Sequence, residues 1–253
     1  GYVSVDSQTV WSDDFCLKPG QRVEMKPVVY PSIADIASMI VFEDEHLIIL
    51  NKPFNLPSQP TADRGRTNLV DKIRDFFWLR DKVVLEPGVI HRLDKDTSGL
   101  IVYLKDMKLH RAFNKMFQTH SIQKTYLAKV AGALKSENGT WEHELSEFPD
   151  PTTKKVILRS GPKPHDLVMG SPPVKYRLAS TEYRVLKKQP ETALLELTPH
   201  TGRMHQLRVQ CAEAGCPIVG DVLYAPSVWQ RHPIMYLHAA GLSFKHPATQ
   251  KQL

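Results

Sequence analysis

The amino-acid sequence predicts an α+β fold, in which helices pack against a sheet. The 253 residues suffice for one large domain, or for one domain with a small appendage. Hydrophobic residues make up 42% and charged residues 24% of the chain, which is ordinary for a globular protein. Roughly ten apolar runs have the period of a strand, and about three longer segments place apolar residues at helical spacing.

Residues 1–30 predict a β-extension that precedes the main domain, residues 31–253. Three short runs in it have the composition of strands, at residues 2–5, 8–10 and 22–25. A Lys-Pro-Gly-Gln turn at residues 18–21 separates the last two runs. This extension is either a separate small module or an ordinary addition to the main sheet.

The main domain opens at residues 40–52 with two predicted strands joined by an acidic turn, and Pro53 ends the second strand. Residues 67–77 begin with a candidate N-cap and then place apolar residues at helical spacing, so they predict a helix. Residues 107–119 predict a second helix for the same reason.

The second half of the chain predicts more strands and one further helix. The predicted strands are residues 122–132, 179–186 and 193–198, and the helix is residues 204–214, closed by Gly215. Residues 141–175 are rich in proline and basic side chains, so we predict an irregular loop. It is either solvated or in contact with RNA phosphates.

A dense polar turn interrupts two apolar runs within residues 89–104. Asp94 lies in this turn, where two rigid supports can hold an exposed reacting group in place. The neighbouring Arg92 and Lys95 favour the charged form of its carboxylate. The same residues also fit a purely structural turn.

The charge and the cysteines limit the class of protein. Lysine and arginine number 33 against 27 acidic residues, and the net charge of +6 is compatible with a polyanionic partner. Three cysteines do not suggest a disulfide framework, so we expect an intracellular, reducing compartment. That compartment is the cytoplasm or, if a targeting peptide has been removed, the mitochondrion. No apolar run approaches the roughly 20 residues of a membrane span, so we expect no membrane partner.

Four segments resemble the RluA-type pseudouridine synthases. The first is His91-Arg92-Leu93-Asp94 with Thr-Ser-Gly-Leu at residues 97–100, which resembles the signature motif of that family. The others are Asn51-Lys52-Pro53, then Lys124-x-Tyr126-x-Ala128, then residues 201–208 with Thr-Gly-Arg, His-Gln and Arg. The resemblance implies a bent, mostly antiparallel sheet flanked by helices, with an RNA-binding cleft. The β-extension resembles the C-terminal part of an alpha-L type RNA-binding module.

The resemblance also implies a reaction and the residues that perform it. Uridine in RNA would become pseudouridine when its C1′–N1 bond breaks and the uracil reattaches through C5. Asp94 would be the catalytic nucleophile, although its carboxylate could either attack the sugar or deprotonate it. Tyr126 would stack on the base and act as a general base, and Arg208 would pair with the aspartate. The residues expected to bind the substrate are Arg92, His91, Thr97, Arg203, His205 and Gln206.

The expected partner is RNA, with ribosomal RNA in an assembly particle as the first candidate. The sequence has no phosphate-binding glycine loop, no Cys-x-x-Cys and no histidine pair at zinc spacing, so we expect neither a metal nor a small-molecule cofactor. One alternative is a ribosome assembly factor that binds RNA on this fold without turnover. A second is a carboxylate hydrolase, for which Asp96 is the only close second acid.

Overall fold

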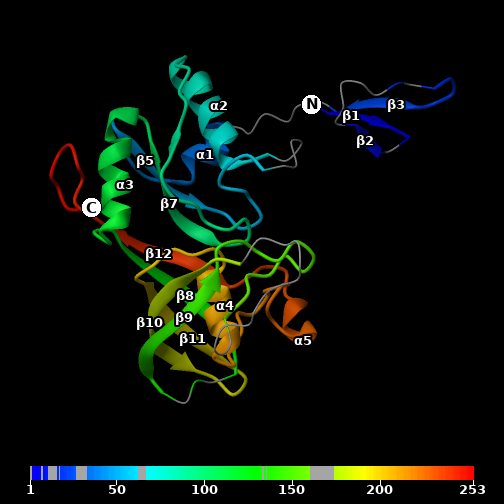
Figure 1. The fold of residues 1–253 in the computed structure, drawn as a ribbon. Coiled ribbons are helices and arrows are strands. Elements are labelled where there is room, and N and C mark those ends of the chain that lie inside the picture. The colour runs from blue at the N-terminus through cyan, green and yellow to red at the C-terminus, as the bar shows by residue number, and fades with distance from the viewer. Residues whose placement is uncertain are drawn as a thin grey trace.

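The structure is a computed structural model, and an N-terminal sheet precedes its main body. It describes residues 2–6, 8–10, 16, 18–26, 33–61, 67–132, 134, 136–159 and 174–253. The first three strands are β1 (Tyr2–Val5), β2 (Gln8–Val10) and β3 (Val23–Lys26), all antiparallel in the order β2-β1-β3. They form a small sheet of their own that stands apart from the larger sheet in Figure 1. The three strands predicted here are confirmed.

A nine-stranded sheet organises the remaining described residues (Figure 1). Its spatial order is β4-β5-β7-β12-β8-β11-β10-β9, and β6 pairs with β7. The pairing of β7 with β12 is parallel, whereas the other pairings in this sheet are antiparallel. The strands are β4 (Ile40–Glu43), β5 (Leu47–Lys52), β6 (Gly88–Val89), β7 (Ser98–Leu104), β8 (Gln123–Ala131), β9 (Asn138–Ser146), β10 (Tyr176–Lys188), β11 (Thr192–Pro199) and β12 (Leu237–Ser243).

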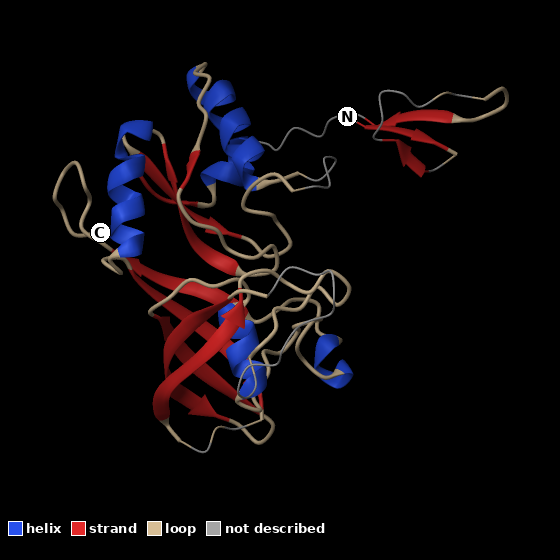
Figure 2. Cartoon of the chain, viewed as in Figure 1, coloured by secondary structure: helices blue, strands red, loops and turns tan. Residues whose placement is uncertain are grey.

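The longer helices α2, α3 and α4 lie beside this sheet (Figure 2). The α-helix α2 begins after Asn68, whose side-chain oxygen accepts the Asp71 N–H at 3.2 Å, and ends at Lys82, whose φ is 58°. None of the helices in the described residues is long and apolar enough to cross a bilayer. The helices are α1 (Ile33–Ala37), α2 (Leu69–Asp81), the 3₁₀-helix η1 (Met107–Leu109), α3 (His110–Gln118), α4 (Gln206–Glu213) and α5 (Ser227–Gln230).

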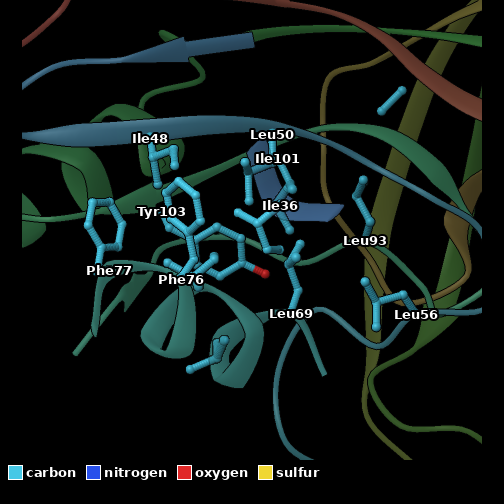
Figure 3. Close-up of a cluster of buried hydrophobic side chains, with 13 residues drawn as sticks. Ile36, Ile48, Leu50, Leu56, Leu69, Phe76, Phe77, Leu93, Ile101 and Tyr103 are labelled. Atoms are coloured by element: carbon cyan, nitrogen blue, oxygen red, sulfur yellow. The ribbon is translucent and has the colours of Figure 1, made fainter. Parts of the chain in front are cut away.

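Two apolar cores lie on opposite faces of β5 and β7, because successive side chains of a strand alternate between faces. On one face, Ile48 and Tyr103 pack against Phe76 and Phe77 of α2 (Figure 3). On the other face, Phe113 of α3 packs among the alternate residues of the same two strands. Each large apolar side chain buried in this way stabilises the fold by about 1.5–3 kcal/mol.

The α4 helix covers the second half of the sheet. Its Leu207 and Cys211 pack on Ala128 and Leu195 from β8 and β11. Tyr126 of β8 touches both this cluster and the cluster beneath α2, so it lies at the junction of the two halves. The predicted α+β fold, with a mostly antiparallel sheet flanked by helices, is confirmed.

The prediction of an irregular loop over residues 141–175 is wrong at its start. Residues up to Ser146 belong to β9, in which Trp141 faces the core and stacks on Tyr183 at a ring-centroid distance of 4.5 Å. The exposed residues that alternate with the inward-facing ones in β9 are all polar, so the strand at this edge of the sheet carries few apolar residues. Residues 160–173, which hold part of the predicted basic loop, lie outside the described residues.

Gly99 is required where β7 meets β12. Its φ is +110°, and an added Cβ would lie 2.3 Å from the backbone oxygen of Ala239. We expect Gly99→Ala to lower the free energy of unfolding by about 2–3 kcal/mol, measured by urea denaturation. Gly215→Ala is the matched control, since Gly215 also has a positive φ but nothing lies within 4 Å of an added Cβ. Equal losses for both variants would show that the close strand approach contributes nothing.

Candidate active site

Asp94 lies in a loop that β6 and β7 hold from both sides. Its backbone oxygen accepts the Thr97 N–H at 3.1 Å, which closes a tight turn, and the Thr97 side chain is buried. The hydroxyl of Ser98 lies 2.9 Å from Nδ1 of His238 in the neighbouring strand β12. The Asp94 side chain remains 31% exposed, so its carboxylate is both fixed and accessible.

Lys52, the last residue of β5, holds the Asp94 loop through hydrogen bonds to backbone oxygens. It is fully buried, and its Nζ donates hydrogen bonds of 3.0–3.1 Å to the backbone oxygens of Pro53, Leu56 and Lys95. From the sequence, Lys52 belongs to a motif but has no predicted role in the site. A lysine at the end of the same strand as the apolar run of residues 47–50 was the signal that could have revealed it.

Burial lowers the pKa of the Lys52 ammonium from 10.5 to about 8, although the charges of Asp96 and Asp94 oppose this shift. Below pH 8 the ammonium is charged in both folded and unfolded chains. Between pH 8 and 10.5 the unfolded chain binds the proton more strongly, so the free energy of unfolding rises with pH through this group. We expect denaturation curves of Lys52→Met to lack this rise. The exposed Lys115→Met is the control for losing a lysine, and parallel pH profiles for native and Lys52→Met would contradict the prediction.

Arg208 joins Asp94 to a second carboxylate. Its Nη1 donates to Oδ2 of Asp94 at 3.1 Å, while its Nε and Nη2 donate to both oxygens of Asp221 at 2.7 and 2.8 Å. Arg208 is 6% exposed, and Asp221 is fully buried. Burial alone would lower the pKa of the guanidinium, but the hydrogen bonds and charges of the two carboxylates raise it. The three groups together carry one negative charge.

Asp221 is the functional residue that the sequence analysis missed most clearly. Its Oδ1 also accepts the backbone N–H groups of Leu223 and Tyr224, at 2.9 and 3.2 Å. The preceding Gly220 has a φ of +82°, and an added Cβ would collide with the backbone oxygen of Ile234. An acid directly after the apolar run Pro-Ile-Val-Gly was the available signal, because a buried carboxylate requires a cation.

His205 approaches Asp94 from the start of α4. Its Nε2 lies 3.8 Å from Oδ2 of Asp94, and its Nδ1 lies 2.9 Å from the hydroxyl of Tyr224. The Tyr224 hydroxyl accepts the Val156 N–H at 2.7 Å, so we assign the Tyr224 hydroxyl as the donor and Nδ1 of His205 as the acceptor of the hydrogen bond between them. The ring proton then sits on Nε2 and faces Asp94. Burial lowers the pKa of His205 despite the opposing charge of Asp94, which favours the neutral ring.

Tyr126 borders the same site from β8. Burial, followed by the charge of Asp94, raises the pKa of its phenol, so the ring stays neutral in the free protein. Its half-buried ring lies between the two core clusters. The structure therefore brings together Asp94, Arg208, His205 and Tyr126 out of the residues predicted for the site.

Two predicted substrate-binding residues are held by hydrogen bonds within the protein. Nε2 of His91 accepts the Val102 N–H at 2.9 Å, and burial, with a smaller effect of the Lys124 charge, lowers its pKa to about 3. Gln206 is buried, and its amide uses both its oxygen and its nitrogen in hydrogen bonds within the protein. The partners of Gln206 are the Thr201 hydroxyl, the Arg203 N–H, the Ser180 oxygen and the Thr181 hydroxyl.

The two predicted arginines differ in their surroundings. Nε of Arg203 donates to the backbone oxygen of Leu178 at 2.9 Å, although the side chain is exposed. Arg92 is exposed too, and no hydrogen bond or ion pair with another described residue holds its guanidinium. It is therefore available to a ligand. No cluster of three or more His, Cys, Asp or Glu in the described part of the chain is arranged to hold a metal ion.

Comparison with known proteins identifies the family. Residues 46–213 match the family model described as RNA pseudouridylate synthase. The dual-specificity RNA pseudouridine synthase RluA of Vibrio cholerae is 36% identical over 213 residues, which cover 83% of this chain and 78% of that protein. The ribosomal large subunit pseudouridine synthase D of Zymomonas mobilis is 33% identical over 232 residues, covering 87% and 68% of the two chains.

Solved structures show the same fold. The human RNA pseudouridylate synthase domain containing 4 superposes with a TM-score of 0.70 at 24% identity, over 87% of this chain and 88% of that chain. The human RNA pseudouridylate synthase domain containing 1 gives a TM-score of 0.66 at 21% identity, over 90% and 85%. The chain therefore belongs to the RNA pseudouridylate synthase family, among its RluA-type members, which are isomerases acting on RNA.

Proposed function

We propose that this protein converts uridine to pseudouridine in ribosomal RNA, with Asp94 as the nucleophile. One observation carries the assignment of Asp94. Both Arg208 and His205 approach Oδ2 of its carboxylate, whereas no hydrogen bond from another described residue reaches Oδ1. One oxygen is thus anchored and the other is open toward a substrate.

The surroundings of Asp94 suit an ionised carboxylate. The charge of Arg208 is already shared with Asp221, so it orients Asp94 without cancelling its negative charge. Oδ1 would attack C1′ of the target nucleotide, and the C1′–N1 bonding pair would leave with the uracil. The liberated uracil anion would turn over against Tyr126 and attack C1′ through C5, and the Oδ1–C1′ bond would break and return its bonding pair to Asp94. Loss of the C5 proton to solvent and gain of a proton at N1 would complete the isomerisation. No redox step is needed.

The target uridine must leave its stacked position before this reaction, at a cost of a few kcal/mol. The exposed Arg92, two residues before Asp94, is placed to occupy the vacated space or to hold the displaced partner base. An aromatic face such as that of Tyr126 stabilises an extruded base by about 1–3 kcal/mol. Ribosomal RNA is favoured because relatives at 33% and 32% identity are named ribosomal large subunit pseudouridine synthases.

Pseudouridine mapping tests the proposal. Total RNA would be compared between cells that lack the protein and cells rescued with the native chain or with Asp94→Ala. We expect at least one ribosomal uridine to be modified only with the native chain. If no site depends on the native chain, or if the dependent site lies outside ribosomal RNA, the proposal is wrong in its activity or in its substrate. Rescue of ribosome assembly by Asp94→Ala without modification would favour the assembly factor instead.

A further inference from the structure

Lys124 is a cation beside the active site that no anion among the described residues accompanies. It lies in β8 two residues before Tyr126, so both side chains project from the same face of the strand. The side chain is half-buried, and no hydrogen bond or ion pair from another described residue reaches its Nζ. Burial lowers the pKa of this ammonium, with no carboxylate close enough to oppose the shift.

Lys124 lies near two segments of the active site. One is the turn of residues 201–203, where a Cβ added to Gly202 would lie 3.6 Å from the Nζ. The other contains His91, whose pKa is lowered in part by the Lys124 charge. The pairing of β8 with β11 begins only at Tyr126, so Lys124 extends beyond that strand toward the turn.

We propose that Lys124 binds a phosphate of the RNA strand next to the target uridine. A desolvated ammonium without a protein partner destabilises the fold, and a phosphodiester supplies the missing charge when RNA binds. The strand spacing places Lys124 about 7 Å from Tyr126 along β8, so a nucleotide whose base lies on Tyr126 has its backbone within reach. This inference rests on the proposed function, since it takes Tyr126 as the surface for the base.

The salt dependence of RNA binding tests this contact. Binding of a short oligouridylate would be measured over a series of salt concentrations for the native chain, Lys124→Met and Lys124→Arg. The plot of log affinity against log salt should lose about 0.7 of slope in Lys124→Met, the contribution of one phosphate contact to single-stranded RNA. Lys124→Arg should retain the native slope. Lys115→Met is the control, because it removes an exposed lysine on α3, which lies on the other side of β5 and β7.

Thermal unfolding separates this role from a structural one. Removing a half-buried cation that has no partner among the described residues should leave the melting temperature of Lys124→Met unchanged or higher. An unchanged salt slope in Lys124→Met, or no salt-dependent binding by the native chain, would overturn the inference. A lowered melting temperature with native RNA affinity would also overturn it and would make Lys124 a structural residue.

A second binding experiment distinguishes the inference from the proposed function. Binding of an oligouridylate with neutral methylphosphonate linkages would be measured and compared with binding of the natural oligouridylate. We expect the neutral linkages to weaken binding to the native chain more than binding to Lys124→Met, and equal weakening would count against the contact. These readouts need no turnover. Phosphate binding that depends on Lys124 without pseudouridine formation would therefore refute only the proposed function.

Discussion

Asp94→Asn is expected to abolish pseudouridine formation while the protein still folds and still binds RNA. Asparagine keeps the shape of the side chain and an oxygen that accepts from Arg208, but it loses the charge and the nucleophile. Removal of a nucleophile costs about 10⁴-fold or more in rate in enzymes where it has been measured. The measurement is single-turnover conversion of uridine in a transcript that carries the mapped site, with RNA affinity determined in parallel.

Asp96→Asn is the matched control for that loss. Asp96 lies two residues away and pairs with Lys95 at 3.3 Å, but no contact links its carboxylate to Arg208. We expect its rate to stay within about threefold of the native rate. An equal loss in both variants would indicate two cooperating acids, as in the hydrolase alternative. Native activity in Asp94→Asn would disprove the assignment of the nucleophile.

Asp221→Leu is expected to cause the largest loss of stability among the variants considered. It leaves Arg208 buried without its bidentate partner and removes the acceptor for two backbone N–H groups. Breaking a buried ion pair on one side typically costs about 3–5 kcal/mol. Urea denaturation should therefore show a free energy of unfolding lower by about that amount, with little turnover remaining because Arg208 no longer holds Asp94.

The double variant Asp221→Leu with Arg208→Met tests the cause of this loss. Most of the expected loss in the free energy of unfolding comes from leaving the buried Arg208 guanidinium without its partner. Removing both partners should therefore recover part of the stability lost by Asp221→Leu alone. Additive losses would show that the carboxylate acts through its backbone contacts instead. Activity should stay low in the double variant, because the anchor of Asp94 is absent.

Local patterns predicted most elements of this fold. The alternation in β8 and the apolar stripe of α3 are each visible within about ten residues, so periodicity was sufficient. β9 was not predicted because it lies at the edge of the sheet, and polar residues outnumber apolar ones in its sequence. The predicted contact between Asp94 and Arg208 joins residues 114 positions apart, and only the family resemblance linked them.

The supporting residues of the site could not be predicted in the same way. Lys52 is buried because two neighbouring strands and the Asp94 loop enclose it, and neither fact is visible in its own segment. Asp221 and Tyr224 act through Arg208 and His205, which belong to a different element. Burial and partnership of this kind depend on tertiary structure, which periodicity does not report.

The position of β12 has a consequence for how the protein matures on the ribosome. This strand is the last of the described strands in the sequence, yet it lies in the sheet between β7 and β8, which are synthesised much earlier. Until it emerges, β7 and β8 each leave an edge without a partner, and the Asp94 loop lacks the contact of Ser98 with His238. A nascent chain is therefore exposed to aggregation and inactive until β12 has been synthesised. We expect translation and catalytic competence to be coupled, so that only chains that include β12 can modify RNA.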